Sequence, residues 1–583
     1  MFGWMGKVAR IDVSCQSLTI EEPPIETYGN YLGGRGLAGH YLRNQCTFNW
    51  YDPAMPLLLF TGPLVGTPSP TSGRMTIMSR SPLTGTVGDC SVGGNLGTEL
   101  KRAGWDGLII TGRSDRLIGI EIIDERVFFA DASGTAGNSA DALSRRLSER
   151  GATAVIGPAA ENGVLFANII VDGHFAAGRN GLGCVMAEKG VKYITVKGSG
   201  ATAVHDPVEV KAASEDVRRL IAASPALLGP CGISRYGTQA LFDLTDIRAV
   251  MPTDNFRKTR FSEAPHINAH AYQERYKPRK SGCRGCHIRC KQRFGAAGTL
   301  PEFETMSHFS ALLCNDDIET VVKAHEICNA AGMDTISAAV TLACHAEITN
   351  ERLRPDEIIS LLSDIGDARG LGKELGRGAA RYALSRGRPD LAMTVKNQEI
   401  PAYDPRGVYG MALAYATSTR GACHLRAYPI SHEILRKPVP TDRFSFDGKA
   451  RIIKISEDAN AVIDSLTACK FVFFGATLEE YARIFQAVTG LKCTFQDLLH
   501  IGDRIYYQER IMNSMNGFSA FDDDLPQRFF TEPADRFPSG ETPPLSRSDF
   551  LNARSDYYRI RGLDNQGNPR EDKARSLGLS WKA

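Results

Sequence analysis

KVARIDV, residues 7–13, is a short run of the apolar and β-branched residues that favour strands. Similar runs next to glycine recur as GLIITG at 107–112 and KYITVKG at 192–198. Glycine is abundant, with 57 residues, which suits many tight turns and close backbone approaches to a bulky ligand. The sequence therefore predicts a β-rich domain over residues 1–205.

After this region the hydrophobic period becomes that of helices. The stretch DDIETVVKAHEICNAAG places four residues on one helical face: Ile318, Val321, Val322 and His325. Asp316 is the expected N-cap, with Glu319 three residues on, and Gly332 suits the C-terminal left-handed position. We expect an α+β protein in which the N-terminal β-rich domain is followed by two mainly α-helical domains, at 206–420 and 421–583.

Bulk composition excludes some classes of function. Lys and Arg total 68 against 66 Asp and Glu, a net charge of +2, without the basic excess of a nucleic-acid binder. The first residues lack the continuous apolar segment of a signal peptide, and the apolar run at 55–60 is far shorter than the roughly 20 residues of a membrane helix. We expect a cytoplasmic protein with no nucleic-acid partner and no membrane span. Its 14 cysteines would be thiols or metal ligands rather than disulfides.

Four glycine-rich stretches lie in the predicted β-rich domain, at 33–39, 72–86, 92–97 and 176–190. None has the Gly-Lys-Ser/Thr ending of a phosphate-binding P-loop, and none is a convincing dinucleotide fingerprint. Three of them carry an arginine: Arg35, Arg74 and Arg179. Backbone N–H groups beside arginine forks can cradle anions, so the pattern favours a large phosphate-bearing ligand approached by several loops.

CRGCHIRC, residues 283–290, fits three kinds of metal centre. C-x-x-C-H can attach haem, but haem attachment normally belongs to exported proteins. Zinc would prefer a second paired Cys/His unit a dozen or more residues on, whereas Cys314, Cys328 and Cys344 are isolated and are expected to be buried apolar residues. An iron–sulfur cluster fits best.

Three thiolates of such a cluster can come from Cys283, Cys286 and Cys290. A fourth ligand must come from elsewhere in the chain. Spacing alone does not choose among Cys469, Cys423 and Cys493 for this role.

The chain as a whole resembles the tungsten-containing aldehyde ferredoxin oxidoreductases. The resemblance is carried in order by motifs such as LGGRGLA, SGRMTIMSRSPLTGT, DGHFAAGRNGLGCVMAEKG, CRGCHIRC, PEFET, YATSTRGACHLRAY and DSLTACKF. It implies a tungsten or molybdenum atom between two pterin dithiolenes in the N-terminal domain, a magnesium ion bridging the pterin phosphates, and one [4Fe-4S] cluster.

The resemblance also implies site residues. Cys469 joins Cys283, Cys286 and Cys290 as a cluster ligand, and Glu304 and His424 form the acid–base pair beside the metal. The implied pterin-binding residues are Arg74, Ser91, Gly93, Gly94, Arg179, Gly183, Cys184, Asn329, Asp334, Asp464, Thr467 and Ala468.

Some positions depart from the family pattern. Ser91 replaces the usual Asn, Cys184 an Ala, and Asn329 an Asp. His287 stands where Pro is usual. Lys323 replaces a Glu that binds iron between subunits in some members, so that metal-bridged dimer is not supported.

The implied reaction is oxidation of an aldehyde to a carboxylic acid, or its reverse. Electrons would pass through the cluster to ferredoxin or to an iron–sulfur partner subunit, in a homo- or hetero-oligomer. Two alternatives remain open. One is a tungsten subunit like that of class II benzoyl-CoA reductases, against which the Glu of PEFET and the His of RGACHLR weigh. The other is a cofactor-binding or electron-relay subunit without catalysis.

Overall fold

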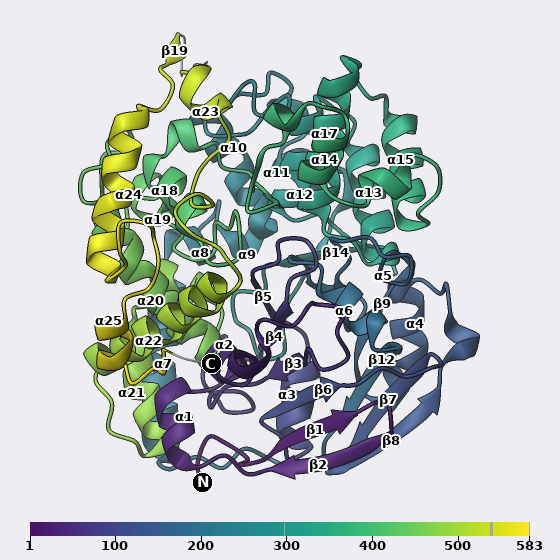
Figure 1. Ribbon diagram of the computed structural model, residues 1–583, viewed down its shortest axis with the longest axis vertical. Helices are drawn as coiled ribbons and strands as arrows, with labels where there is room; N and C mark the ends of the chain where they lie inside the picture. The colour runs from purple at the N-terminus through teal and green to yellow at the C-terminus, as the bar shows by residue number, and fades with distance from the viewer. Residues whose placement is uncertain (297, 537–539, 582–583) are drawn as a thin grey trace.

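The computed structural model describes residues 1–296, 298–536 and 540–581, and two six-stranded sheets form its N-terminal part (Figure 1). The first sheet contains β1 (Val8–Asp12), β2 (Ser17–Glu21), β3 (Leu57–Phe60), β4 (Met75–Arg80), β5 (Val87–Val92) and β6 (Gly107–Thr111). The second contains β7 (Ile118–Ile123), β8 (Arg126–Asp131), β9 (Ala152–Ile156), β10 (Ile169–Val171), β11 (Phe175–Ala177) and β12 (Val191–Lys197).

The three runs predicted as strands form β1, β6 and β12, which confirms the β-rich N-terminal region. The first sheet has the order β2-β1-β6-β3-β4-β5, with β1 parallel to β6 and antiparallel to β2. In the second sheet, of order β11-β10-β9-β12-β7-β8, β12 runs parallel to β7 and antiparallel to β9. Strand β3, LLLF, is apolar at every position because it is buried on both faces.

Short helices connect these strands: α1 (Ile25–Tyr31), α2 (Gly34–Leu42), α3 (Leu96–Arg102), α4 (Ala140–Leu147), α5 (Pro158–Glu161) and α6 (Leu182–Glu188). The start of α2 lies against the backbone of the distant segment 464–467, where a Cβ on Gly34 would clash with the Asp464 carbonyl. Gly34 also has φ of 38°, so this position requires glycine for two reasons.

The rest of the chain is mainly helical, as predicted. The middle region contains α7 (Pro207–Ala223), α8 (Pro225–Leu228), α9 (Ile233–Tyr236), α10 (Phe242–Ile247), α11 (Ala269–Tyr276), α12 (Phe303–Phe309), α13 (Ile318–Ala331), α14 (Thr335–Thr349), α15 (Pro355–Gly366), α16 (Gly372–Leu375), α17 (Ala379–Ser385) and α18 (Tyr409–Thr417). The last region contains α19 (Ile430–Glu433), α20 (Lys449–Leu466), α21 (Leu478–Thr489), α22 (Phe495–Met515), α23 (Arg528–Thr531), α24 (Arg547–Arg561) and α25 (Glu571–Ser576).

Small sheets interrupt the helices. They are formed by β13 (Arg279–Ser281), β14 (Lys291–Phe294) and β15 (Gly298–Thr299), by β16 (Thr394–Val395) and β17 (Gln398–Glu399), and by β18 (Ala534–Asp535) and β19 (Glu541–Thr542). The first of them brackets the cysteine motif, because β13 ends just before Cys283 and β14 begins just after Cys290.

Helix α13 has the predicted buried face and the predicted Gly332 at its C-terminus, with φ of 74°. The predicted N-cap was wrong by one residue. Asp317, not Asp316, accepts hydrogen bonds from the Glu319 and Thr320 backbone N–H groups. The cause is register: a cap must lie directly before the first helical residue, which is Ile318.

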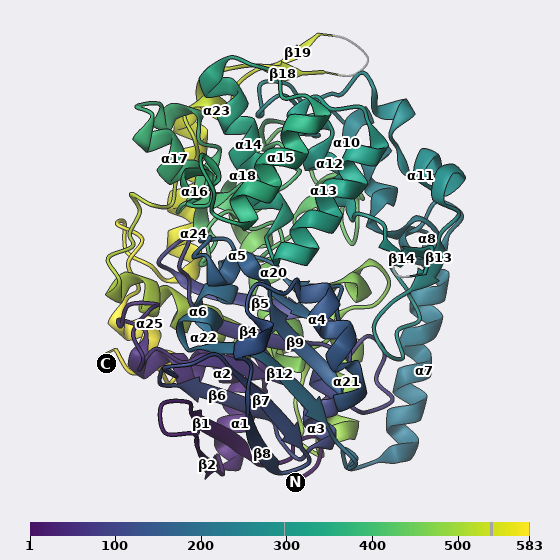
Figure 2. The same ribbon diagram turned by 90° about the vertical axis from the view of Figure 1, so that its right-hand side faces the viewer.

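Apolar cores cross the predicted domain boundaries, whose positions stay a prediction. Figure 2 shows α7 running beside α21, although about 270 residues separate them, and an apolar cluster joins these helices to the first sheet. Two exposed ion pairs also link α7 to α21, since Arg483 contacts Glu209 and Asp216 at 2.5 and 2.7 Å. A second apolar cluster contains residues of both six-stranded sheets and of α12, α13, α14 and α18, so the core is continuous between the sheets and these helices.

Within the described ranges, no helix combines the length and the apolar composition needed to cross a bilayer.

Candidate active site and metal centre

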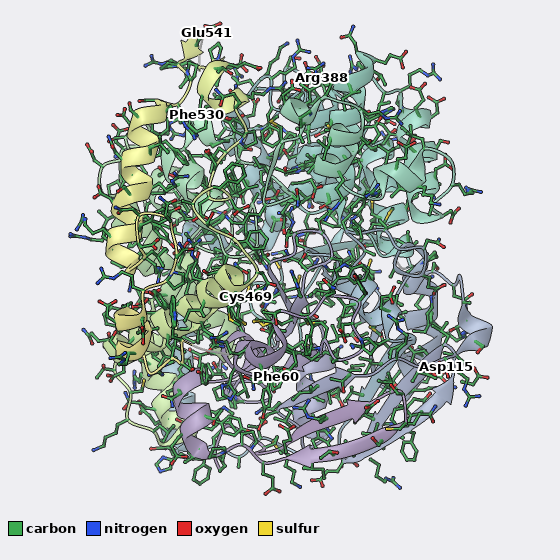
Figure 3. The ribbon with its side chains drawn as sticks, viewed as in Figure 1. Phe60, Asp115, Arg388, Cys469, Phe530 and Glu541 are labelled. Carbon is green, nitrogen blue, oxygen red and sulfur yellow. The ribbon has the colours of Figure 1, made fainter. Side chains whose placement is uncertain are left out.

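A cavity of about 740 Å³ lies where the N-terminal sheets meet the helices, and residues from all three predicted domains line it. Figure 3 labels one of these residues, Cys469, near the middle of the molecule. Both predicted acid–base residues, all four predicted cluster ligands and seven of the twelve predicted pterin-binding residues line this space. They are Glu304, His424, Cys283, Cys286, Cys290, Cys469, Arg74, Ser91, Gly93, Arg179, Asn329, Asp334 and Asp464.

Glu304 lies in the first turn of α12 with its carboxyl group at the cavity wall. Its Oε2 accepts a hydrogen bond of 2.8 Å from the Ala402 backbone N–H, while its buried Oε1 has no hydrogen-bond partner. Burial raises the pKa of this carboxyl from 4.5 to about 8. Such a group can give up or take a proton near neutral pH, as a catalytic acid or base must.

His424 faces Glu304 across the same wall, with 3.5 Å between its Nε2 and the Glu304 Oε1. Its Nδ1 is buried without a hydrogen-bond partner. Burial, assisted by the positive charge of Arg179, holds the pKa of this imidazole well below its usual value. The ring is therefore neutral at physiological pH and can donate one N–H and accept at the other nitrogen.

Two tyrosines that sequence reasoning did not assign to the site extend this wall. The hydroxyl groups of Tyr403 and Tyr428 are 3.1 Å apart, and both rings lie about 6 Å from the His424 ring, at 5.8 and 6.0 Å between centroids. Both side chains line the cavity. Tyr428 ends the quoted motif YATSTRGACHLRAY and Tyr403 lies in none of the quoted motifs, and only packing shows that both face a cavity rather than the core.

A third residue missed as functional is Cys423, directly before His424. Its Sγ accepts hydrogen bonds from the Arg420 Nε and Nη2 at 3.2 and 2.9 Å and from the Leu425 backbone N–H at 3.3 Å. Burial opposes ionisation, but the charges of Arg420 and Arg426 outweigh it and lower the pKa of this thiol. From its spacing in the sequence, Cys423 is only a candidate for the fourth cluster ligand. The structure pairs it with Arg420 instead.

The four predicted cluster cysteines line the cavity. Cys283 and Cys286 are adjacent in the loop between β13 and β14, where the Cys286 N–H donates to the Cys283 carbonyl at 3.1 Å. Cys469 follows α20, and its N–H donates to the Thr71 carbonyl. Cys290 ends the loop of Cys283 and Cys286, directly before β14.

These thiols are not spaced for a single small ion. In the described part of the chain, no three His, Cys, Asp or Glu side chains converge closely enough to hold one metal ion. A zinc ion would need its thiolates at about 2.3 Å. Burial raises the pKa of the Cys469 thiol to about 11, so ligation would require a strongly positive centre that stabilises the thiolate.

The other isolated cysteines have ordinary surroundings. Cys328 and Cys344 are buried, as expected. The expectation was wrong for Cys314, which is half-buried, because it ends the turn after α12 in a left-handed conformation with φ of 54°. His287, in the cysteine loop, is exposed.

Arg74, Ser91 and Gly93 form the part of the cavity next to the cysteines. Arg74 donates to the Ser91 hydroxyl from Nε at 2.9 Å and to the Ser91 carbonyl from Nη2 at 2.5 Å. Gly93 has the Cys283 sulfur so close that a Cβ would clash with it. This position therefore needs glycine if Cys283 is to reach the cavity.

Arg179 and Asp334 pair on another wall. The Arg179 Nε lies 3.2 Å from the Asp334 Oδ2, and the rest of the guanidinium donates to the carbonyls of Ala422 and Glu399. Asp334 also caps α14 by accepting from the Ile336 N–H at 3.1 Å. One carboxylate thus fixes both a helix start and a cavity arginine.

Asn329 lies on the inward face of α13, beside His325. The sequence pattern identifies this histidine only as part of the buried helix face. The Asn329 Nδ2 is 3.2 Å from the His325 Nε2, and the buried His325 Nδ1 has no partner. Burial lowers the pKa of His325 to about 4, so this ring is neutral.

Asp464, near the end of α20, receives two positive side chains. Its Oδ2 lies 2.7 Å from the Lys470 Nζ and 3.5 Å from the Arg35 Nη1, whereas its buried Oδ1 has no hydrogen-bond partner. Arg35 itself is fully buried and donates to both carboxylate oxygens of Glu509, at 2.6 and 2.8 Å. Arg35 does not line the cavity, so of the three glycine-loop arginines only Arg74 and Arg179 face it.

Five predicted pterin-binding residues lie behind the cavity wall rather than on it: Gly94, Gly183, Cys184, Thr467 and Ala468. Thr467 accepts from the Gly62 N–H at 3.0 Å, which fixes the glycine loop after β3. The Cys184 thiol donates to the Val164 carbonyl at 2.9 Å, and burial raises its pKa to about 12.

Comparison with known proteins places this geometry in context. A model of the N-terminal domain of aldehyde ferredoxin oxidoreductase matches residues 8–198, and a model of domains 2 and 3 matches residues 212–579. The tungsten-containing aldehyde ferredoxin oxidoreductases of Pyrococcus furiosus and Thermococcus kodakarensis are 34% and 33% identical to this chain over the full length of both proteins.

More distant relatives share the architecture. The WOR-like subunit of an aliphatic sulfonate oxidoreductase from Pyrococcus furiosus is 25% identical, over 99% of this chain and 97% of its own. The active-site complex BamBC of benzoyl coenzyme A reductase with 1,5-dienoyl-CoA superposes with a TM-score of 0.86 at 21% identity, over 99% of this chain and 97% of the other, which shows the common fold. Together with the full-length matches, these findings show that the chain belongs to the tungsten-containing aldehyde ferredoxin oxidoreductase family.

Proposed function

We propose that this protein oxidises aldehydes to carboxylic acids at a tungsten or molybdenum bis-pterin centre. In this proposal the electrons leave through a [4Fe-4S] cluster to ferredoxin or to an iron–sulfur partner subunit. Membership of the family supports an oxidoreductase, and the relatives at 33–34% identity are named for aldehydes and ferredoxin. The observation that carries the specific reaction is the Glu304–His424 pair, each with an unpartnered atom on the cavity wall.

The chain fits a bis-pterin in three respects. The cavity of about 740 Å³ has room for a large organic group. The buried, unpartnered Oδ1 of Asp464 and the guanidinium of Arg74 offer a hydrogen-bond acceptor and an anion site in the cavity lining. Gly93 lines the cavity without adding a side chain to it. Arg74, Arg179, Asp334 and Asp464 would hold the pterins.

The four half-buried thiols that line the cavity likewise fit an iron–sulfur cluster held by Cys283, Cys286, Cys290 and Cys469. The predicted magnesium ion fits less well. Both oxygens of Ser91 already accept hydrogen bonds from Arg74, which suits a phosphate beside the guanidinium better than a cation. Magnesium takes no part in the reaction proposed for this site.

The overall reaction converts an aldehyde and water to a carboxylic acid, two protons and two electrons. When bound, the metal centre would accept the two electrons and the cluster would pass them outward singly. Glu304, once ionised, takes a proton from water or from the aldehyde hydrate through its free Oε1. The neutral ring of His424 donates an N–H to the substrate oxygen and so holds the aldehyde group in a fixed orientation beside Glu304.

The aromatic side chains beside this pair limit access of water. Tyr403 and Tyr428 bind each other through their hydroxyls, and the Tyr428 ring continues to Phe474 at 5.9 Å. An apolar wall next to a carboxyl group keeps its pKa high and strengthens each hydrogen bond that the substrate makes there.

The first test measures tungsten, molybdenum, iron and pterin in purified protein and assays an aldehyde panel with a viologen dye. Glu304→Gln and His424→Asn should each lower kcat by about 10²–10⁴-fold while metal and pterin content stay unchanged, because each removes one proton-handling group. The matched control is Glu263→Gln and His266→Asn, since these residues form an exposed glutamate–histidine pair at 3.1 Å. The control variants should keep full activity.

The outcomes separate the alternatives. Unchanged turnover of the metal-loaded Glu304→Gln and His424→Asn proteins would point to a subunit without its own catalysis at this pair. Reduction of benzoyl-CoA with no aldehyde oxidation would favour the alternative function, that of a class II benzoyl-CoA reductase subunit. Absence of both metals and of pterin from the purified protein would overturn the proposal.

A further inference from the structure

The loop that carries three cluster cysteines lies in a strongly basic part of the surface. Residues 277–294, KPRKSGCRGCHIRCKQRF, contain seven Lys or Arg and no Asp or Glu, although the whole chain is nearly balanced at 68 against 66. Six of the seven are exposed: Lys277, Arg279, Lys280, Arg284, Arg289 and Arg293. The exposed Arg235 of α9 adjoins them, because its carbonyl accepts from the Gln292 side chain at 3.1 Å. We call these seven exposed residues the basic face.

Few carboxylates neutralise this face. Arg284 pairs with Glu99 at 2.9 Å. Lys291, the half-buried member of the run, pairs with Glu302. Within the described part of the chain, the other members of the basic face have no carboxylate within ion-pair distance, and Arg289 donates instead to the Lys280 carbonyl at 2.7 Å. Uncompensated charge of this kind is available to a partner.

The hairpin places two of these charges where they oppose each other. β13 and β14 are antiparallel, and Arg279 lies directly across from Arg293 in their register. Like charges at directly opposite positions destabilise a strand pair. The opposed arginines therefore add no stability to the fold. A negatively charged partner would reduce the repulsion between them.

Most of the basic face belongs to the same segment as three of the proposed cluster ligands, through which electrons would leave. Figure 2 shows β13 and β14 at the edge of the molecule. Cys283 and Cys286, which line the cavity, are half-buried rather than enclosed. An electron carrier has to bring its own centre close to this loop.

We infer that the basic face is the docking surface for an acidic iron–sulfur electron carrier, positioned over the cysteine loop by charge complementarity. The inference rests on the proposed function and adds the place and the chemistry of the partner. Oppositely charged surfaces steer encounter and fix orientation, so the association rate should fall as salt rises. Exposed charges of this sort contribute more to the rate of encounter than to the stability of the fold.

The test compares two electron acceptors, an acidic ferredoxin with two [4Fe-4S] clusters and methyl viologen, a small dication. Arg279→Glu places opposite charges across the hairpin, so the variant should melt no lower than the unchanged protein. Arg279→Glu with Arg293→Glu should raise the KM for ferredoxin at low salt by about tenfold and flatten its salt dependence. Viologen-linked turnover should not fall in either variant.

The matched control reverses two exposed basic residues on α16 and just after it, Lys373→Glu with Arg377→Glu. Figure 2 places α16 on the opposite side of the molecule from β13. This control should leave the KM for ferredoxin unchanged.

Titration calorimetry with the same ferredoxin measures docking without turnover. An unchanged KM and an unchanged, salt-insensitive affinity in Arg279→Glu with Arg293→Glu would overturn the docking surface. If the unchanged protein does not oxidise aldehydes with viologen, the proposed function is contradicted. The docking surface would still be supported if the unchanged protein binds ferredoxin with a salt-dependent affinity and the double variant does not.

Discussion

At the scale of single residues, the site depends on two groups whose surroundings push their pKa values in opposite directions. Burial raises the pKa of Glu304 to about 8 and, together with Arg179, lowers that of His424 well below its usual value. Because the pKa of this carboxyl lies above that of the imidazole, the reverse of the usual order, the carboxyl group is protonated over part of the pH range in which the imidazole is neutral. Opposed shifts within one cavity are typical of an acid–base pair.

The raised pKa of Glu304 predicts the direction of the pH profile. Glu304 acts as a base only after it loses its proton, and its ionised fraction falls about tenfold for each pH unit below its pKa. Viologen-linked kcat/KM should therefore rise with pH and level off above about 8. The measurement is kcat/KM from pH 6 to 9.5. The residual activity of Glu304→Gln should lack this rise, and a profile in the unchanged protein that is flat or falls across the range would contradict the role.

Several site residues could be predicted from the sequence because their motifs are local and specific, as with Glu304 in PEFET and His424 in GACHLR. Others could not. Tyr403 and Cys423 are residue types that usually pack in the core, and only the tertiary structure turns them toward a cavity. Arg35 shows the opposite error, since its glycine-rich loop resembles an anion cradle but its partner, Glu509, lies 474 residues away.

At the scale of elements, hydrophobic periodicity predicts which segments form strands and helices better than it predicts the residues at which they begin and end. The run 7–13 predicts β1 because alternation and turn residues act locally. The N-cap of α13 differs by one residue because Asp316 and Asp317 are chemically equal candidates and backbone register decides between them. The β13–β14 hairpin was not predicted, since its charged strands lack a hydrophobic pattern and pair around the cysteine loop.

Buried ion pairs join elements from opposite ends of the chain, which gives a prediction about stability. Arg35 of α2 and Glu509 of α22 are both almost fully buried, so Arg35→Met leaves Glu509 without its bidentate partner. Loss of one partner of a buried pair costs about 3–5 kcal/mol. Thermal unfolding of Arg35→Met should therefore begin several degrees lower than that of the unchanged protein.

The control for this prediction is an exposed pair between other helices. Arg483 of α21 contacts Glu209 of α7 at 2.5 Å, with 48% and 40% of the side chains exposed. Arg483→Met should cost about 1 kcal/mol or less. Equal melting shifts for the two variants would mean that the buried pair does not hold α2 against α22.

At the scale of the whole molecule, the cavity is the place where distant parts of the chain meet. β5, α12, α14 and α20 each bring at least one lining residue, and the apolar clusters on both sides border it. Several buried polar atoms around it have no protein partner, among them the Asp464 Oδ1 and the His325 Nδ1. A fold with unpartnered polar atoms around a shared hollow is more stable once a ligand supplies the missing partners.

Loading with metal and pterin should therefore stabilise the whole protein. Ligand that binds only the folded state adds about 1.4 kcal/mol for each tenfold excess of its concentration over its dissociation constant. Protein produced without tungstate or molybdate should melt several degrees lower than loaded protein, and proteolysis should cut it faster. Tungstate added alone to pterin-free protein is the control and should not shift the melting temperature, because the pterin sulfurs would hold the metal. Equal melting temperatures and equal cleavage rates for loaded and unloaded protein would contradict this prediction, because the folded protein would then be equally stable without the cofactor.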